Sequence, residues 1–518
     1  MSFILAITPI ALILILMVGL RWGAVQAGVI GYLSALAIAG LFFGAGPLLF
    51  AYSHARAFLL SLDVLLVIWA AFLLYRIADE AGAIQTIAEA LPHLSADRDL
   101  QAMITGWIFA SFLQSVGGFG VPVAVTAPIL ISLGFSPLAS VLIPSIGHGW
   151  MVTFGSLALA FQTMVAASGL PGRLLAPPSA LFLGMVAPLV GMMVAHAAGG
   201  WMAVRKLWLH ALIIGGVMGF LQYQLAIRGL WPIAAFGASL AGFLLAIPLA
   251  RRFRQAETSS RQTRRLAWRP LITALSGYAL LVVVVLCVQM IPGLFSALGQ
   301  VVLHIQFPAL KTMGGLLALP PHITPAGSGL EIVIFRQTGV VLFYAAAAAY
   351  LVYKLAGQYD RGAERRILSS TLHSVLFPSL SILLMVCMAV IMQYSGMTET
   401  LANGLAAVTG SHFPVAAPWI GALGAFITGS NTNSNVVFTV LQMRTAQLLG
   451  ISIPAILAAQ TAGAGLASVL APAKVVVGTS TTGMAGHEGE VMRRMIAYTI
   501  LLLLFISLLA WISSPAAG

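Results

Sequence analysis

The most constraining segment of this chain reads Ile427-Thr428-Gly429-Ser430-Asn431-Thr432-Asn433-Ser434-Asn435. Seven of its last eight residues carry a hydroxyl or amide side chain, and apolar residues flank the segment on both sides. Lipid cannot hydrogen-bond such a cluster, so the cluster must face a cavity, bind a polar ligand or pair inside the protein. Because Ser, Asn and Gly favour helix caps and breaks over helix interiors, the segment predicts a helix–turn–helix tip at membrane depth. Such a tip would present polar groups to a small solute.

The composition places this tip in a membrane protein. Of the 518 residues, 60% are hydrophobic and 7% are charged, whereas ordinary soluble domains carry about 25% charged residues. Repeated runs of roughly 20 apolar residues predict an all-α polytopic membrane protein with about 12 transmembrane helices. The predicted spans lie near residues 3–20, 24–47, 57–75, 138–168, 176–198, 203–222, 231–250, 271–291, 338–353, 370–393, 455–485 and 493–513.

Two further apolar segments, 102–134 and 412–450, are interrupted near their middles by polar or Gly-rich residues. Each is therefore predicted to be a re-entrant hairpin rather than one long span. Loop charge supports a consistent topology. If the basic segments 251–269 and 354–366 lie in the cytoplasm, alternation of the spans leaves both termini outside. The first hairpin then enters from the cytoplasm and the second enters from outside.

The formal charge of +12 does not indicate a nucleic-acid partner. Seven arginines and one glutamate lie between residues 251 and 269, as the positive-inside bias expects of a cytoplasmic loop. No basic face lies outside the membrane-flanking loops. Cys287 and Cys387 both fall within apolar spans, so they provide neither a disulfide framework nor metal-ligand spacing.

The two halves of the chain resemble each other in sequence. Leu133-Gly134-Phe135-Ser136 closes the first hairpin, Leu449-Gly450-Ile451-Ser452 closes the second, and matching landmarks lie 314 to 316 residues apart. Close helix packing explains scattered glycines but not this spacing together with the polar cluster. We therefore predict an inverted repeat, whose broken helices meet near the midplane with their termini aimed at the substrate. Its units are an N-terminal half (1–250) with hairpin 102–134 and broken helix 138–168, a basic cytoplasmic linker (251–269), and a C-terminal half (270–518) with hairpin 412–450 and broken helix 455–485.

At these hairpins the chain resembles the L-lactate permease family, which also includes glycolate permeases. Gly118-Phe119-Gly120-Val121-Pro122-Val123-Ala124 is similar to the family's GFGxPVA hairpin, and Thr428 to Asn435 is similar to its TGS(D/N)TxSN segment. Ala471-Pro472 and the closing stretch Thr482 to Gly489 also fit. The resemblance is specific in 60–160 and 420–500 and is limited to hydropathy in the middle of the chain.

The resemblance implies a secondary transporter of the bacterial inner membrane, related to a wider ion-transporter superfamily with paired hairpins and often elevator-like movement. Its substrates would be short 2-hydroxymonocarboxylates such as L-lactate, D-lactate or glycolate, taken up with protons. A homodimer is an option, because elevator-type relatives often form one. This chain departs from the family pattern at Lys474, where lactate permeases usually have an uncharged polar residue, and at His148, which lies in a stretch of small residues.

A carboxylate that leaves water needs compensating donors. Helix N-termini supply free N–H groups and partial positive charge, and glycines let the backbone approach the anion closely. Amide and hydroxyl side chains both donate and accept, which suits a ligand with one carboxylate and one hydroxyl. The candidate substrate-binding residues are Gly117, Gly118, Gly120, Ser145, Ser430, Asn431, Thr432, Asn433, Ser434, Asn435, Thr461 and Lys474.

Titratable residues at membrane depth are costly and are functional candidates by default. For proton coupling these are His148, Asp63 and Glu331. His148 is the best placed proton carrier, because the ordinary pKa of histidine lies near physiological pH; the alternative is a packing histidine bonded to a carbonyl. The alternative role for Asp63 is a structural pairing with a neighbouring helix. The alternative for Glu331 is a position in an external loop, and the alternative for Lys474 is a loop-facing position from which its side chain snorkels to the surface.

Three other functions are alternatives to proton symport. A sodium-coupled transporter of another small anion is the nearest, since Asn, Ser and carbonyl oxygens suit sodium; only the second hairpin is rich in them, which favours protons. A membrane-embedded enzyme should show paired carboxylates, a metal-ligand cluster or a nucleophile with its base, and no such pattern or P-loop is present. A channel fits the repeat less well than alternating access. We therefore expect no enzyme, no cofactor and no metal, with the carboxylate substrate and the lipid bilayer as partners.

Overall fold

The computed structural model describes residues 1–20, 22–91, 95, 97–118, 120–254, 268–324 and 327–514. Within these residues, nine helices are long and apolar enough to cross a membrane, or ten if the bent pair Pro137–Met151 and Gly155–Ser168 forms one span. The prediction of an all-α polytopic membrane protein is thereby confirmed, whereas the count of twelve crossings and the inverted repeat stay predictions. The linker 251–269 lies largely outside the described residues, and so does Phe119 in the first hairpin.

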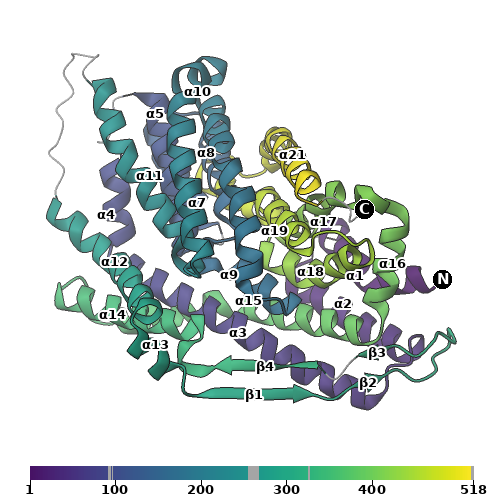
Figure 1. Ribbon diagram of the computed structural model, residues 1–518. Helices are drawn as coiled ribbons and strands as arrows, with labels where there is room; N and C mark the ends of the chain where they lie inside the picture. Colours follow the sequence, from purple (N-terminus) through teal and green to yellow (C-terminus); the bar gives the residue numbers. More distant parts are fainter. Residues whose placement is uncertain are drawn as a thin grey trace.

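Two long antiparallel helices run through the lower part of the molecule (Figure 1): α3 (Pro47–Glu80) and α15 (Ala363–Tyr394). Trp69 donates to Ser379 Oγ at 3.0 Å, and Arg76 donates to Ser374 Oγ at 3.1 Å. At one end of the pair, Arg366 forms an ion pair with Glu80 at 2.6 Å. Helices packed against this pair include α2 (Ala24–Leu41), α14 (Thr338–Leu355) and α16 (Met397–Thr409), while α4 (Ala83–Ala90) follows α3. Outside them, α1 (Ser2–Gly19) packs on α2 and α16, and α12 (Trp268–Met290) packs on α14 and α4.

The first hairpin begins with one continuous helical arm, α5 (Arg98–Met103), the π-helical η2 (Ile104–Phe109) and α6 (Ala110–Val116), and returns as α7 (Val121–Ser132). A broken helix follows. Its parts are α8 (Pro137–His148), the short η3 (Gly149–Met151) and α9 (Gly155–Ser168), with a bend of 48° at the break.

The helix α10 (Gly172–Ile227) reverses direction at Gly199–Gly200, where the backbone leaves the helical region. A Cβ placed on Gly219 would lie 2.5 Å from the Gly184 carbonyl oxygen. The two arms are therefore packed antiparallel with their backbones in close approach, as small residues permit in membrane helices. They correspond to the predicted spans 176–198 and 203–222. The next helix, α11 (Trp231–Arg254), packs against α10.

A β-ribbon interrupts the helices between α13 (Pro292–Leu298) and α14, in a region for which the sequence pattern predicted no structure. Its outer pair is β1 (Val302–Phe307) with β4 (Gly327–Val333), its inner pair is β2 (Leu310–Lys311) with β3 (Ile323–Thr324), and both pairs are antiparallel. The ribbon runs along the lower edge of the molecule (Figure 1), and η4 (Ile334–Arg336) follows it. It docks on the α2–α3 turn, where Met313 N donates to Gly44 O at 2.7 Å and Leu316 N donates to Leu41 O at 3.0 Å.

The second half repeats the order of hairpin, broken helix and long helix. The hairpin is α17 (Phe413–Thr428) and α18 (Asn431–Leu448), preceded by η5 (Gly410–His412). The broken helix is α19 (Ile453–Ser468) and α20 (Pro472–Thr481), and α21 (Glu488–Ser513) ends the described chain. Ser136 and Ser452 cap α8 and α19 in the same way, each accepting from the N–H three residues later.

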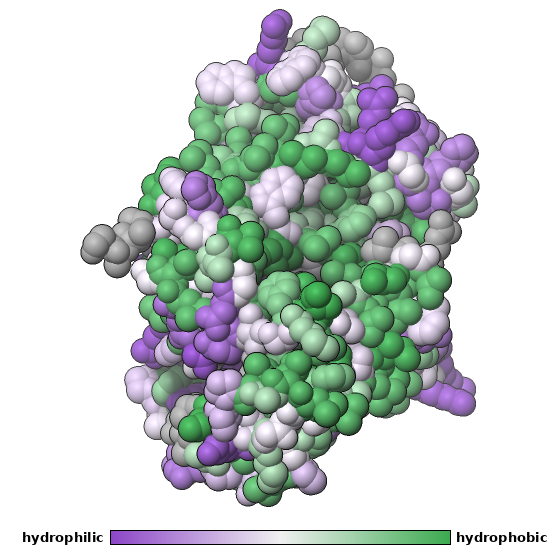
Figure 2. All heavy atoms as spheres, turned by 90° about the vertical axis from the view of Figure 1, so that its right-hand side faces the viewer, coloured by the Kyte–Doolittle hydropathy of each residue, from purple (hydrophilic) through white to green (hydrophobic). Residues whose placement is uncertain are grey.

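The surface fits an apolar solvent. Hydrophobic residues cover a broad area of the face seen in Figure 2, and hydrophilic residues gather in separate patches. Large apolar side chains such as Trp201, Phe220 and Leu376 are exposed. Buried polar side chains instead collect in the two hairpins and the two broken helices, which is where the candidate site lies.

Candidate functional site

The second hairpin tip and the breaks of both broken helices meet around one cavity, called here the inner cavity, with about 330 Å³ of space between its lining atoms, part of it open to solvent. The cavity is lined by Gln114, Val152, Gly155, Ser156, Leu159, Ala160, Gly429, Ser430, Asn431, Thr432 and Lys474. Four of these lining residues, Ser430, Asn431, Thr432 and Lys474, are among the residues proposed from sequence.

The N-terminus of α18 lies at this cavity. Gly429 has φ +70°, which reverses the chain after α17, and Ser430 caps α18 by accepting from Asn433 N at 3.2 Å. The first amides of any helix have no acceptor within it and carry the positive end of its dipole. Asn431 and Thr432, which line the cavity, supply those amides, so this wall suits an anion.

Asn431 connects the two broken helices. Its amide nitrogen donates to Thr153 Oγ1 at 3.1 Å and to Thr461 O at 3.2 Å. The Thr153 hydroxyl in turn donates to Thr461 O at 3.0 Å. Residues from three segments that are far apart in sequence therefore form one hydrogen-bond network next to the wall that Asn431 lines, called here the floor of the cavity.

A second layer of the network lies behind this floor. Asn435 donates to Ala160 O at 2.8 Å and to Thr461 Oγ1 at 2.9 Å. Gln460 donates to Ser434 Oγ at 3.3 Å, and Ser434 donates to Gly421 O at 2.7 Å. Asn435, Gln460 and Ser434 support the cavity without lining it, because each satisfies a partner inside the protein.

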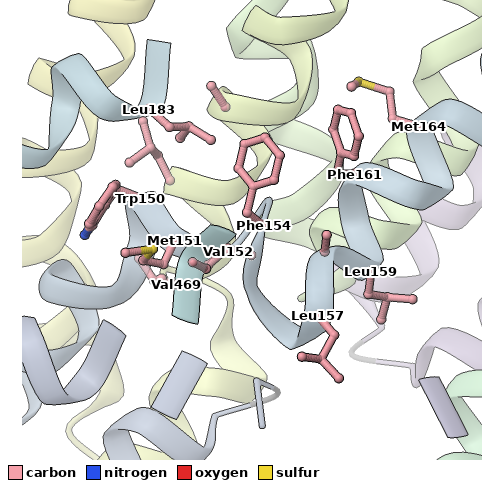
Figure 3. Close-up of a cluster of buried hydrophobic side chains, with 14 of the residues drawn as sticks. Trp150, Met151, Val152, Phe154, Leu157, Leu159, Phe161, Met164, Leu183 and Val469 are labelled. Atoms are coloured by element: carbon pink, nitrogen blue, oxygen red, sulfur yellow. The ribbon is translucent and has the colours of Figure 1, made fainter. Parts of the chain in front are cut away.

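The first turn of α9 has unusual backbone geometry. Ser156, Leu157 and Ala158 form a left-handed turn with φ of 48°, 58° and 65°. Left-handed conformation costs roughly 1–2 kcal/mol per non-glycine residue, and such strain clusters at functional sites. Figure 3 shows Phe154 and Phe161 on either side of this turn, and their rings stack at 5.1 Å.

The first hairpin tip lies beside this turn. Gly118 and Gly120 have φ of +62° and +92°, and a Cβ on Gly118 would lie 2.1 Å from Ser156 Oγ. Gly120 adjoins Val477 of α20, whereas Gly117 packs against Tyr75 instead of the cavity. None of the three glycines is among the residues that line the inner cavity, and the tip adjoins it through the contact of Gly118 with Ser156.

Gln114 is a cavity residue that the sequence pattern did not single out as a contact. It is 3% exposed, lines the inner cavity, and its Oε1 has no hydrogen-bond partner among the described residues. A buried amide of this kind is costly unless a ligand completes it. The sequence signal that could have identified Gln114 is its position one turn before a glycine-rich hairpin tip.

Lys474 is the charged residue among those lining the inner cavity. It is half-buried in the first turn of α20, and its ammonium donates to Ser468 Oγ at 3.1 Å. Within the described part of the chain it forms no ion pair. Its ammonium is therefore placed beside the inner cavity with a hydroxyl as its hydrogen-bond partner.

Several proposed residues lie away from the cavity. Ser145 bonds Val141 O within its own helix at 2.7 Å. Asn433 lies on another face of α18, in an apolar pocket with Ile10 and Val437. The structure thus gives no direct contact with the inner cavity for these two.

The proposed proton carriers are also dispersed. His148 is buried at the end of α8, where Nδ1 bonds Pro144 O at 2.6 Å and Nε2 has no partner among the described residues. Glu331 lies in β4 opposite His304, not in a membrane helix, and its side chain is outside the described atoms. Asp63 belongs to α3, and its side chain is likewise not described.

Apolar spans, paired hairpins and a small polar cavity define a multi-pass membrane transporter. The chain belongs to the L-lactate permease family, whose model matches residues 2–516. This confirms the resemblance seen at the hairpins, and it identifies the protein as a transporter and not an enzyme.

Two characterised relatives are similar along most of their length. The glycolate permease GlcA of Escherichia coli (strain K12) is 27% identical, over 97% of this chain and 93% of its own. The L-lactate permease of Salmonella typhimurium (strain LT2) is 27% identical, over 84% of this chain and 81% of its own. Among solved structures, the YdaH transporter of Alcanivorax borkumensis shares 17% identity over 86% of this chain and 84% of its own, at a TM-score of 0.47. Membership of the permease family, the bacterial sources of the two permeases and the apolar helices confirm the predicted location as a multi-pass protein of a bacterial inner membrane.

Proposed function

We propose that this protein carries short 2-hydroxymonocarboxylates, such as lactate or glycolate, into the cell together with protons. The names of its relatives support the substrate class. One observation carries the proposal: the inner cavity combines Lys474 with the N-terminus of α18, and no acidic residue is among its lining residues.

The polar groups of the cavity match such a ligand. The carboxylate would take the Lys474 ammonium and the first amides of α18, both of which are charge-complementary. The 2-hydroxyl would pair with an amide or hydroxyl that both donates and accepts, such as Gln114 or Thr432. A monocarboxylate fits better than a dicarboxylate, because the cavity offers one cation.

Proton coupling is favoured over sodium coupling by the network under the cavity. The oxygens of Thr153 and Thr461 already accept hydrogen bonds from Asn431 and Asn435. A sodium site would need such oxygens free to ligate. His148, buried with one ring nitrogen that has no partner in the described part of the chain, is the proposed proton carrier.

Uptake by purified protein in liposomes tests the proposal. Radiolabelled L-lactate should enter by counterflow without any ion gradient, and should accumulate when an inward proton gradient is imposed. If only a sodium gradient drives accumulation, the coupling ion is sodium and not the proton. If neither lactate nor glycolate shows counterflow, the proposed substrate class is wrong. Competition by pyruvate, malonate and acetate then measures the importance of the 2-hydroxyl and of single charge.

Replacement of Lys474 and His148 separates binding from coupling. Lys474→Gln should raise the apparent KM at least about 10-fold, since a charged hydrogen bond contributes about 1.5–3 kcal/mol, with Lys474→Arg retaining part of the affinity. His148→Ala should abolish proton-driven accumulation while counterflow persists. Normal accumulation by His148→Ala would remove this histidine as the carrier.

A further inference from the structure

Three cavities follow one another along α18. The inner cavity includes Thr432. A middle cavity of about 430 Å³ includes Val436 and Val440, and an outer cavity of about 350 Å³ includes Arg444. These four residues are spaced four apart, so each adjoins the next on the helix surface, along a row that winds by about 120° around the helix in all. Together they span about 18 Å along its axis.

The opposite walls of the cavities are also continuous. Gln393 of α15 lines both the outer and the middle cavity. Ala160 of α9 lines the inner cavity, and Thr163, less than one turn further along α9, lines the middle one. The series therefore leads from the ribbon, whose His322 and Thr324 line the outer cavity, to the candidate binding site.

Each cavity contains one lysine or arginine: Arg444 in the outer, Arg56 in the middle and Lys474 in the inner cavity. None of the three forms an ion pair with a carboxylate within the described residues. Arg444 donates to Gln447 at 2.9 Å, and Arg56 donates to the Tyr394 hydroxyl at 3.1 Å. Half-buried cations without acidic partners are costly in a membrane protein, so their recurrence in three successive cavities needs a reason.

We propose that this row of α18 residues lines the route by which the anion moves between the ribbon side and the inner cavity, with Arg444 and Arg56 as successive binding residues. The identity of the anion as a short carboxylate rests on the proposed function. Glu399 also lines the outer cavity and weakens anion binding there, as conduction requires sites that release what they bind.

The middle cavity is closed to a charged solute in this arrangement. Apart from Arg56, Thr163 and Gln393, its lining is aliphatic, with residues such as Leu60, Val64, Val386, Val390, Val436 and Val440. An apolar constriction of this kind excludes water and ions. The α9–α18 pair must therefore separate from α3 and α15 for the anion to pass.

Cysteine labelling tests the route independently of the substrate. In a background with Cys287 and Cys387 replaced by alanine, Val436→Cys and Val440→Cys lie on the route, and Val437→Cys lies in the apolar pocket by α1. Exposed Lys311→Cys marks the ribbon side. A membrane-impermeant anionic methanethiosulfonate should modify the two route cysteines at least about 10-fold faster than Val437→Cys, from the side that labels Lys311→Cys. Equal slow rates at all three, or labelling only from the other side, would overturn the proposal.

The two arginines are tested by the charge of the reagent. Val440→Cys should react faster with the anionic reagent than with its trimethylammonium analogue. Arg444→Gln or Arg56→Gln should reduce that ratio at least about 5-fold, and Lys at either position should restore it. Arg361→Gln, in the exposed α14–α15 turn, removes the same charge as a control. An unchanged ratio in both Gln variants would overturn the role of the arginines.

The labelling and transport experiments distinguish an incorrect route from an incorrect substrate class. If route cysteines label as expected but L-lactate is neither transported nor protective against labelling, the substrate class is wrong and the route stands. If lactate is transported while the route cysteines stay as slow as Val437→Cys, the anion takes another path.

Discussion

Asn431 and Asn433 are two residues apart, yet their environments differ because a helix turns by about 200° over that interval. Asn431 bonds Thr153 and Thr461, whereas the Asn433 Oδ1 has no partner among the described residues. Sequence alone gave both the same predicted role. The structure separates them, since only Asn431 contacts the inner cavity.

Asn431→Ala should therefore reduce transport more than Asn433→Ala. The first change removes the donor that Thr153 and Thr461 share, and leaving these groups without it costs about 1–3 kcal/mol. The apparent affinity for L-lactate should therefore fall at least about 5-fold. Asn433→Ala should change it by less than about 2-fold. Uptake kinetics in liposomes, normalised to folded protein, measure both, and equal losses would move the site toward the α1 side of α18.

Gly118 and Gly134 form a matched pair within the first hairpin. Both have positive φ, but a Cβ at Gly118 would lie 2.1 Å from Ser156 Oγ, whereas at Gly134 it would meet nothing within 4 Å. Gly134→Ala should lower stability by about 1–2 kcal/mol. Gly118→Ala should lower stability by about 1–3 kcal/mol more than Gly134→Ala does, because the added methyl group crowds Ser156. It should also impair transport. Thermal unfolding in detergent compares the two, and removing the Ser156 hydroxyl in Gly118→Ala/Ser156→Ala should recover part of the loss.

At the level of elements, the ribbon links helices that are distant in sequence. It bonds the α2–α3 turn through Met313 and Leu316. It also contacts the α15–α16 turn, where a Cβ on Gly396 would lie 3.0 Å from the His322 side chain. Because His322 also lines the outer cavity, the docking of the ribbon shapes that cavity.

Acidification should loosen this docking. Burial lowers the pKa of His322 below its ordinary value and Arg444 acts in the same direction, while Glu399 and the bond to the Gln393 backbone oppose the shift. A lowered pKa means that the docked state prefers neutral imidazole, so docking is strongest above the ordinary pKa of about 6.5 and weakens as pH falls below it. Hydrogen exchange of the ribbon amides, corrected for intrinsic pH effects, should rise between pH 7.5 and 5.5. His322→Gln should lose that dependence; an identical pH response in the variant would exclude His322.

At the scale of the whole molecule, both halves have hairpin, broken helix and long helix in the same order. An inverted repeat requires the two hairpins to have their bases on opposite membrane faces. Ser132 and Gln447 are exposed at equivalent positions near the ends of α7 and α18.

Cysteines at these two positions should therefore label from opposite sides. In the background lacking native cysteines, Ser132→Cys should react with an impermeant reagent only from the cytoplasmic side, and Gln447→Cys only from outside. Lys311→Cys should follow Gln447→Cys, because the ribbon is predicted to lie outside. Labelling of Ser132→Cys and Gln447→Cys from the same side would exclude the inverted arrangement.

The class of fold was predictable because its signals are local. A backbone in lipid must satisfy its own hydrogen bonds, so apolar runs must be helices and a polar cluster such as Ser430 to Asn435 must mark a protected break. The reversal of α10 at Gly199–Gly200 also agreed with the predicted spans. The ribbon at 302–333 was not predictable in the same way, because its strands have two to seven residues and prolines lie in the connections between them.

The composition of the site depended on contacts between distant segments. The sequence pattern identified Ser430, Asn431, Thr432 and Lys474, but not Gln114, Thr153 or the left-handed turn at Ser156. Polar residue types show that hydrogen bonds must be formed, since unpaired groups are too costly in an apolar medium. They do not show with which partners. That depends on how the hairpins and broken helices pack, which brings Thr153, Asn431 and Thr461 within hydrogen-bonding distance across some three hundred residues of chain.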